Sequence, residues 1–130
     1  MSDAAPEEPR GELTTSTMAR PKDTNPSGDI FGGWLMSIMD LASANVAFER
    51  AGGRVATVAV DKIEFHHPVT VGDVVSCYAE VNRVGRTSLS TRVEVWIRGR
   101  KGGPARKVTQ GEFTFVALDE DGRPRPVDEA

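Results

Sequence analysis

The segment GGWLMSIMDLASANVAFER, residues 32–50, determines how the rest of the chain must be arranged. Its apolar side chains recur at helical spacing in one stripe, formed by Leu35, Ile38, Met39, Ala42 and Val46. The glycine pair at positions 52 and 53 is typical of a helix end. We therefore predict one long helix that is buried on most sides.

One acidic residue, Asp40, lies in the middle of this helix and is the only ionisable side chain between Trp34 and Phe48. A carboxylate removed from water without a partner costs several kcal/mol, so its presence indicates a task. At about 100° per residue, it shares its side of the helix with Met36, Ser43, Ala44 and Ala47. These mostly small residues leave room for a second subunit or a narrow ligand slot. The alternative is that Asp40 only caps or hydrogen-bonds a neighbouring element.

Strand patterns lie on both sides of the helix. Residues 13–19 (LTTSTMA) form a short candidate strand, and residues 23–31 (DTNPSGDIF) indicate a loop in which Asp29 is placed to cap the helix. Residues 55–65 alternate as in a strand, which His66-His67-Pro68 ends. Three more strands are predicted at residues 73–84, 86–98 and 108–118. The connections suit antiparallel neighbours, so the predicted class is α+β, a long central helix wrapped by a five-stranded antiparallel sheet.

The length of 130 residues favours one domain, for which we expect residues 13–118, between a flexible tail at 1–12 and a polar tail at 119–130. No apolar run is long enough for a membrane span, and MSDAAPEEPR is unlike a secretory signal. The single Cys77 excludes an internal disulfide and is expected to be a small buried thiol. These features favour a cytoplasmic protein without a membrane partner.

Charge is distributed unevenly along the chain. Residues 83–107 hold eight basic side chains and one acid, Glu94, a balance of +7 in a chain whose net charge is −3. Such a band suits an anionic partner, although an ordinary solvated face explains it equally well. Its one aromatic residue, Trp96, is too little for the stacking platform of a nucleic-acid-binding protein. His66 and His67 point to opposite faces of a strand, so we expect a rim role for them and no metal site.

Several motifs occur together and in order. They are N-x-x-G-x-x-x-G-G at residues 25–33, Met-Asp at 39–40, V-G-R-T-S at 84–88 and a closing FTFVALDEDGR at 113–123. Over about residues 13–125, the chain resembles the hotdog-fold acyl-CoA thioesterases of the YciA-like group, which are related to the brain acyl-CoA hydrolases. His66-His67 replaces the apolar and basic pair more usual in that family before Pro68.

The resemblance implies hydrolysis of an acyl-CoA to a free acid and CoA. It also implies a hotdog fold that dimerises through continuous sheet edges, is often assembled as a hexamer (a trimer of dimers), and has its active sites between subunits. Asp40 would be the general base that activates water or the nucleophile that forms a mixed anhydride, and both remain open. Asn25 would orient the water or the thioester. The backbone N–H groups of Gly32 and Gly33, at the positive end of the helix, would stabilise the oxyanion.

The turn formed by Gly85, Arg86, Thr87 and Ser88 matches the CoA-contacting turn of that family, in which Arg86 would pair with phosphate. Without the resemblance, it is an ordinary hairpin turn. No cofactor is expected, because the CoA thioester is the substrate. A non-hydrolytic acyl-CoA-binding hotdog protein and a hotdog dehydratase remain as alternatives, although His67 lies outside a dehydratase motif. Acyl-chain length stays open, with Phe65, Met36 and Met39 as residues that could limit it.

Overall fold

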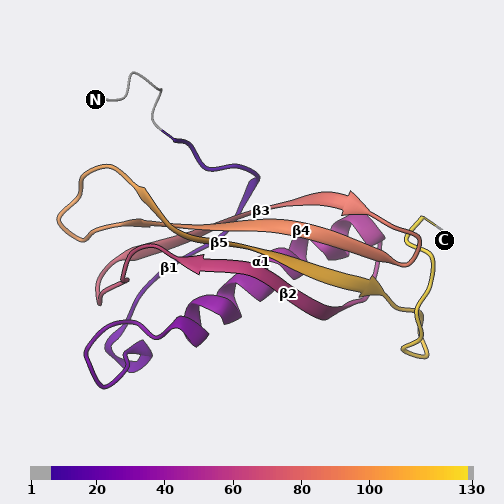
Figure 1. The fold of residues 1–130 in the computed structure, drawn as a ribbon, viewed down its shortest axis with the longest axis horizontal. Coiled ribbons are helices and arrows are strands. Elements are labelled where there is room, and N and C mark those ends of the chain that lie inside the picture. Colours follow the sequence, from indigo (N-terminus) through magenta and orange to yellow (C-terminus); the bar gives the residue numbers. More distant parts are fainter. Residues whose placement is uncertain (1–6, 129–130) are drawn as a thin grey trace.

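The computed structural model describes residues 7–128 of the chain (Figure 1). The chain folds in the order β1 (Glu12–Met18), the 3-10 turn η1 (Pro21–Asp23), α1 (Gly32–Ala51), β2 (Val55–Phe65), β3 (Val74–Val84), β4 (Ser88–Arg98) and β5 (Arg106–Ala117). The predicted sequence of one strand, one long helix and four further strands is confirmed.

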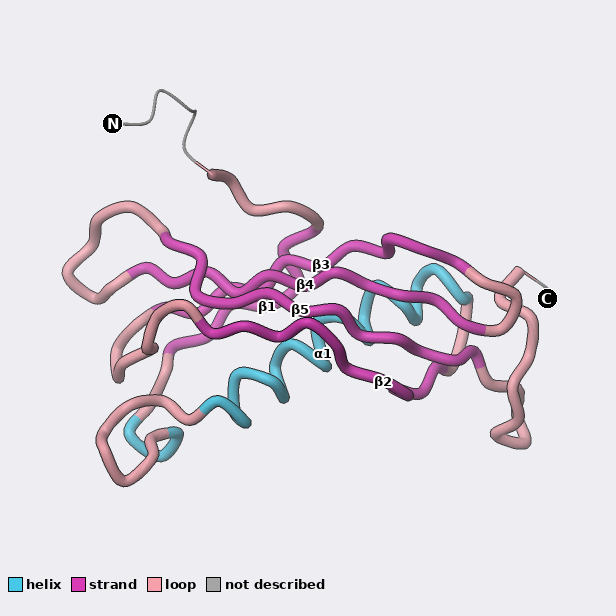
Figure 2. The backbone as a smooth tube through the Cα atoms, viewed as in Figure 1, coloured by secondary structure: helices cyan, strands magenta, loops and turns pink. Residues whose placement is uncertain are grey.

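The five strands form a single antiparallel sheet in the order β1-β3-β4-β5-β2. Figures 1 and 2 show the strands side by side, with α1 crossing one face of the sheet obliquely. Because β2 follows α1 in the chain but pairs with β5, it becomes an edge of the sheet, far from β1. The predicted α+β class, with one helix against a five-stranded antiparallel sheet, is confirmed.

The core forms between α1 and the sheet face that it covers. Leu35, Met39, Ala42 and Val46 of the predicted apolar stripe are buried there, and Ile38 packs partly buried against them. On β4, alternate residues such as Val93 and Val95 join the same core. The helix ends as predicted, because Gly52 adopts a left-handed φ of 71° that few other residues tolerate.

The predicted cap at Asp29 is wrong. The helix begins after Phe31, which holds the N-cap position and makes no side-chain cap hydrogen bond. Asp29 instead closes a turn with Asn25, whose backbone N–H donates to the Asp29 carbonyl oxygen at 2.7 Å. Asp29 therefore lies two residues before the N-cap position and belongs to the turn of the loop, not to the helix.

The strand predicted at residues 55–65 is confirmed as β2, although two irregularities interrupt its alternation. The register of β2 against β5 shifts between Thr57 and Ala59 and again between Asp61 and Glu64, and Lys62 has a φ of 56°. The second irregularity carries Ile63 close to Gly111 of β5, where an added Cβ would lie only 2.7 Å from Ile63 Cγ1. Between Asp61 and Glu64, close packing of Ile63 on Gly111 thus takes the place of regular β2–β5 pairing.

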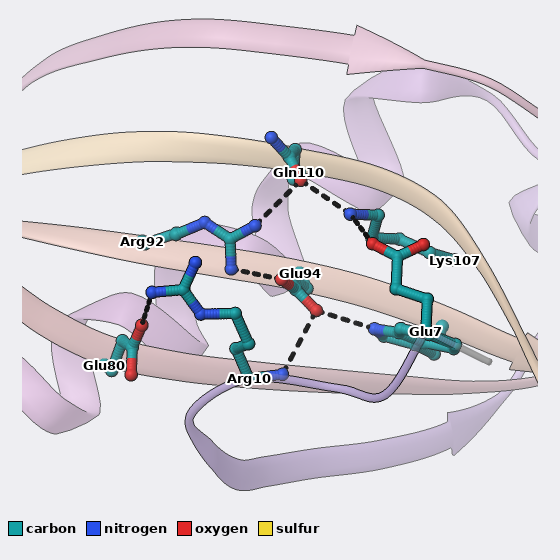
Figure 3. Close-up of polar contacts among 8 residues, drawn as sticks. Glu7, Arg10, Glu80, Arg92, Glu94, Lys107 and Gln110 are labelled. Atoms are coloured by element: carbon teal, nitrogen blue, oxygen red, sulfur yellow. Dashed lines mark hydrogen bonds and ion pairs between the residues drawn. The ribbon is translucent and has the colours of Figure 1, made fainter. Parts of the chain in front are cut away.

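The sheet face opposite α1 carries a polar network that the segment before β1 covers (Figure 3). The Arg10 backbone N–H donates to Glu94 Oε1 at 3.2 Å, and Lys107 pairs with Glu7 at 2.5 Å. Arg92 also pairs with Glu94, whose side chain is only 1% exposed. Residues 7–10 therefore pack on the sheet.

Near the other end of the chain, backbone N–H groups of Arg125 and Val127 donate to Ala117 and Arg86, at 2.9 and 2.8 Å. Residues 1–6 and 129–130 of the two expected tails lie outside the described residues, and the domain boundaries at 12 and 119 stay a prediction. Within residues 7–128, no helix has the length and apolar content needed to cross a membrane.

Candidate active site

Asp40 lies half-buried on α1 beside the edge strand β2. Its Oδ1 accepts a hydrogen bond of 2.7 Å from the Thr57 hydroxyl. Its Oδ2 accepts no hydrogen bond from any residue between positions 7 and 128. One carboxylate oxygen is therefore fixed in place while the other is available to a water molecule or a substrate, as a general base or a nucleophile requires.

Asn25 lies in the loop before α1, and its side-chain oxygen is already used by that loop. Oδ1 accepts the backbone N–H groups of Ser27 at 2.9 Å and of Asp29 at 3.1 Å. Its Nδ2 donates to no acceptor among the described residues. Asn25 can therefore offer an N–H donor to a carbonyl or water oxygen, held by a loop that its own oxygen stabilises.

Gly32 and Gly33 form the first turn of α1, where backbone N–H groups have no intrahelical acceptor and the helix dipole is positive. Aromatic rings stand close to both residues. A Cβ on Gly32 would lie 3.4 Å from the Phe65 ring, and one on Gly33 would lie 3.2 Å from the Phe31 ring. Glycine thus keeps the backbone donors accessible between two rings, an arrangement that suits a developing oxyanion.

One protomer does not bring these groups together. Gly32 and Asp40 are eight positions apart on one helix, a separation of about 12 Å along its axis. A reacting carbonyl must be about 3 Å from both the nucleophile and the oxyanion donors. If both groups act on one thioester, Asp40 must therefore come from one copy of the chain and the backbone donors of the first helical turn from another copy.

The surface around Asp40 is suited to such a second copy. The edge strand β2 leaves Val58 57% exposed and Val60 39% exposed, and Met36 of α1 is 37% exposed beside Asp40. An unpaired strand edge with exposed apolar side chains is a ready site for pairing with another strand.

The turn from Gly85 to Ser88 joins β3 to β4 and is held firmly. Gly85 donates its backbone N–H to the Ser88 carbonyl at 2.7 Å, and the Thr87 carbonyl accepts the Ala117 N–H at 2.9 Å. The Arg86 side chain is exposed and forms no ion pair with any described residue. The turn can therefore present a free guanidinium to an anion.

A large cleft of about 1020 Å³ lies near this turn, between the end of α1 and residues 118–128. Its lining includes the basic side chains of Arg50, Arg54 and Arg125. No sequence pattern predicts this cleft, because the polar segment 119–128 shows no periodicity that indicates its return to the helix end. In the structure, Arg125 Nη2 donates to the Ala51 carbonyl at 2.8 Å and Arg50 Nη1 donates to Asp128 Oδ1 at 2.7 Å, which joins the segment to the helix end.

The eight basic residues between positions 83 and 107 do not form one patch in the protomer. Arg86 lies before one end of β4, whereas Arg98 and Arg100 lie at the other, about 33 Å away along the strand. Arg92 and Lys107 are paired with acids on the sheet face. Alternation and strand length thus separate the members of the basic stretch within one protomer, and whether it serves an anionic partner or is a solvated face stays open.

His66 and His67 are exposed beyond the end of β2, and His66 Nε2 lies 3.8 Å from Glu64 Oε2. Residues 7–128 contain no cluster of three or more His, Cys, Asp or Glu side chains that could hold a metal ion. Cys77 is buried as predicted, and burial raises the pKa of its thiol to about 12. A thiol that stays protonated is not a nucleophile at neutral pH.

Known proteins match nearly the whole chain. The family model for the thioesterase superfamily matches residues 27–103. The acyl-CoA thioester hydrolase YciA of Salmonella typhimurium is 51% identical over 122 residues, 92% of each chain. The Escherichia coli K12 protein of the same name is 49% identical over 120 residues, 90% of this chain and 91% of the relative.

Solved structures agree with these sequence matches. A hexameric thioesterase from Yersinia pestis superposes with a TM-score of 0.89 at 48% identity, covering 95% of this chain and 100% of that one. An acyl-CoA hydrolase from Staphylococcus aureus, solved in complex with butyryl-CoA, has a TM-score of 0.81 at 31% identity, covering 86% and 68%. By sequence and by fold, the chain belongs to the thioesterase superfamily, as a hotdog-fold member of the YciA-like group.

Proposed function

We propose that this protein hydrolyses acyl-CoA thioesters to the free carboxylic acid and CoA, at a site shared by two copies of the chain. The observation that carries the proposal is the Asp40 carboxylate, which Thr57 holds by one oxygen while the other is available. Relatives that are about half identical are named acyl-CoA thioester hydrolases. A similar solved structure is described as a hexameric broad-specificity acyl-coenzyme A thioesterase.

In the general-base route, Asp40 takes a proton from a water molecule whose oxygen attacks the thioester carbonyl carbon. The carbonyl oxygen becomes negatively charged and accepts hydrogen bonds from the backbone N–H groups of the partner subunit's Gly32 and Gly33. When the carbon–sulfur bond breaks, the CoA sulfur leaves with the electron pair and receives the proton from Asp40. In the nucleophilic route, Asp40 itself attacks the carbonyl carbon, and the carbon–sulfur bond breaks so that CoA leaves as a thiolate and a mixed anhydride remains. Water then hydrolyses the anhydride, which releases the acid, restores the Asp40 carboxylate and supplies the proton that the thiolate takes up.

Asn25 and the turn between β3 and β4 orient the substrate. The free Nδ2 of Asn25 donates to the thioester carbonyl or to the attacking water, from the same copy as the oxyanion donors. Arg86 pairs with the phosphates of CoA, while Gly85 allows close approach and the hydroxyls of Thr87 and Ser88 bond pantetheine or phosphate. The Arg86 side chain is exposed on a fixed turn and has no ion pair within residues 7–128, which supports this assignment.

Two copies pair through β2, so that two sheets become continuous, and three dimers form a hexamer. The unpaired edge of β2 and the 12 Å separation along α1, an estimate from about 1.5 Å per residue, support the dimer. The Yersinia pestis structure is described as hexameric, which supports the larger assembly. The reaction needs no cofactor, and its substrate places the protein in the lipid metabolism of the cytoplasm.

The test is incubation of the protein with butyryl-CoA and a thiol reagent. Catalytic release of free CoA is the expected result. Binding of butyryl-CoA without CoA release would indicate a non-hydrolytic acyl-CoA-binding protein, and loss of water from a 3-hydroxyacyl-CoA would indicate a dehydratase. Either result would contradict the proposed hydrolysis.

A further inference from the structure

A cleft of about 360 Å³ opens beside the first turn of α1, between that turn and the end of β2. Its floor is apolar and buried: Ile30, Leu35 and Val69 are at most 6% exposed. A backbone hydrogen bond of 2.9 Å from Ile30 to Val69 ties the floor together. Apolar walls with a few polar groups at the rim are the usual form of a pocket for a small apolar group.

Phe65 forms the exposed wall of this cleft. Its side chain is 48% exposed, whereas Phe113 and Phe115 of the neighbouring strand are at most 1% exposed. The ring stands against the first turn of α1, because a Cβ at Gly32 would lie 3.4 Å from it. A large apolar ring left half in water at a cleft mouth is available for contact with an apolar ligand.

The cleft and the oxyanion donors share the same helical turn. A thioester carbonyl oxygen bound by the N–H groups of Gly32 and Gly33 places its carbonyl carbon at the cleft mouth. The acyl chain leaves that carbon on the side away from the sulfur. If the acyl side of the thioester faces the cleft and the sulfur faces solvent, the chain passes the Phe65 ring before it reaches the floor formed by Leu35 and Val69.

We infer that this cleft is the acyl-binding site and that Phe65 limits the length of the acyl chain. Short unbranched aliphatic chains end within the cleft, and longer chains require the ring to move. The rim residues Asp29, His66 and His67 are polar, so the apolar surface available to a chain ends there. This inference rests on the proposed function, because it takes Gly32 and Gly33 as the oxyanion donors.

The test measures binding without turnover. The dissociation constants of the thioethers S-butyl-CoA and S-dodecyl-CoA are determined by calorimetry for the wild type, Phe65→Ala and Phe65→Trp. Phe65→Ala should shift the preference toward the dodecyl ligand by about tenfold or more, since pocket contacts of this size discriminate chains to that extent. Phe65→Trp, which narrows the cleft, should shift the preference toward the butyl ligand.

Phe48→Ala is the matched control, because Phe48 is 55% exposed on α1 and lies about 24 Å along the helix from Gly32. It should leave the ratio of the two dissociation constants unchanged. If both Phe65 variants also leave the ratio unchanged, the inference is wrong. If Phe65→Ala does not fold, Phe65→Leu is measured in its place.

The two proposals fail in different ways. If the Phe65 variants change the preference between the two thioethers but the wild type releases no CoA from acyl-CoA, the proposed hydrolysis is wrong and the acyl site is supported. A wild type that hydrolyses acyl-CoA, with thioether preferences indifferent to Phe65, would overturn the acyl site and support hydrolysis.

Discussion

The Thr57 hydroxyl donates a hydrogen bond of 2.7 Å to Asp40 Oδ1, which joins the edge strand β2 to the middle of α1. This contact fixes the orientation of the carboxylate, because a side chain held at one oxygen loses most of its rotational freedom. Because the two oxygens belong to one planar carboxylate, fixing Oδ1 also fixes the direction of Oδ2. In the proposed reaction Thr57 therefore acts by positioning Asp40.

Asp40→Asn should lower turnover of butyryl-CoA by about 10² or more, since a positioned acid or base typically contributes about 10²–10⁴-fold. The fold should persist, because the amide keeps the size of the side chain and its oxygen can still accept the Thr57 hydrogen bond. Steady-state release of CoA and thermal unfolding check both statements. Asp121→Asn, in the exposed loop after β5, is the control. A variant with a lowered unfolding temperature but normal turnover would indicate a purely structural Asp40.

Thr57→Val removes the hydroxyl and keeps the branched shape. We expect kcat to fall about tenfold or more, because a hydrogen bond to a charged group contributes about 1.5–3 kcal/mol, with little change in KM. The unfolding temperature should change little, since Thr57 is exposed on an edge strand. Thr57→Ser should restore most of the activity. If serine were as inactive as valine, the shape of the side chain, and not its hydroxyl, would be the important property.

The helix and the position of Asp40 could be predicted because both depend on local pattern. An apolar stripe with 3.6 periodicity, ended by Gly52, predicts the helix, and a single acid within it is conspicuous. Thr57 could not be found in this way. Its role depends on where β2, paired far along the chain with β5, comes to lie beside α1, and no local signal in VATVAV indicates that register.

Other features failed or were missed for the same reason. Asp29 has the residue type of a cap, yet the turn closed by Asn25 determines its use. Glu94 looked like an isolated acid among basic residues, but the sheet and residues 7–10 make it the centre of a buried network. Long-range packing thus decides the roles of polar residues, whereas apolar periodicity decides the elements.

Glu94 should make the stability of the protein depend on pH (Figure 3). Burial favours the neutral acid, but hydrogen bonds from Trp96, Arg92 and the Arg10 backbone, together with the charge of Arg92, outweigh burial and lower the pKa of Glu94. A lowered pKa stabilises the fold above the unfolded value, about 4.3, and this contribution is lost as the pH falls through the folded pKa.

Glu94→Gln should therefore lower the free energy of unfolding by about 1.5–3 kcal/mol at neutral pH, since it removes the charge from these hydrogen bonds. The difference from the wild type should shrink below about pH 4.3. Chemical denaturation at a series of pH values measures both. Glu120→Gln, in an exposed loop, is the matched control. A deficit that stays constant into acid would show that shape, and not charge, accounts for the effect.

Complementation between two inactive variants should reveal the shared site. Asp40→Asn removes the base, and Asn25→Asp keeps the oxygen that holds the loop while removing the Nδ2 donor. A mixed dimer of the two variants contains one site with both wild-type residues, if Asp40 and Asn25 of a site come from different copies. Co-expressed variants should therefore regain activity that neither has alone.

Sedimentation of the same samples should show at least a dimer at micromolar concentration. Val58→Lys, which places a charge on the exposed edge of β2, should reduce both association and turnover. A co-expressed pair no more active than the separate variants, or a fully active monomer, would contradict a site between subunits.

Arg86→Ala should raise KM for acyl-CoA about tenfold or more and leave kcat nearly unchanged. The phosphates of CoA lie far from the thioester, so their contacts are similar in the ground and transition states, and a hydrogen bond to a charged group contributes about 1.5–3 kcal/mol. The loss should be largest at low salt, where screening is weakest. Arg100→Ala is the control, because it removes the same charge near the opposite end of β4. With an acyl-pantetheine substrate, which has no nucleotide, the effect of Arg86→Ala should shrink. An equal effect on both substrates would show that Arg86 acts through the fold, and the turn from Gly85 to Ser88 would then have no role in binding CoA.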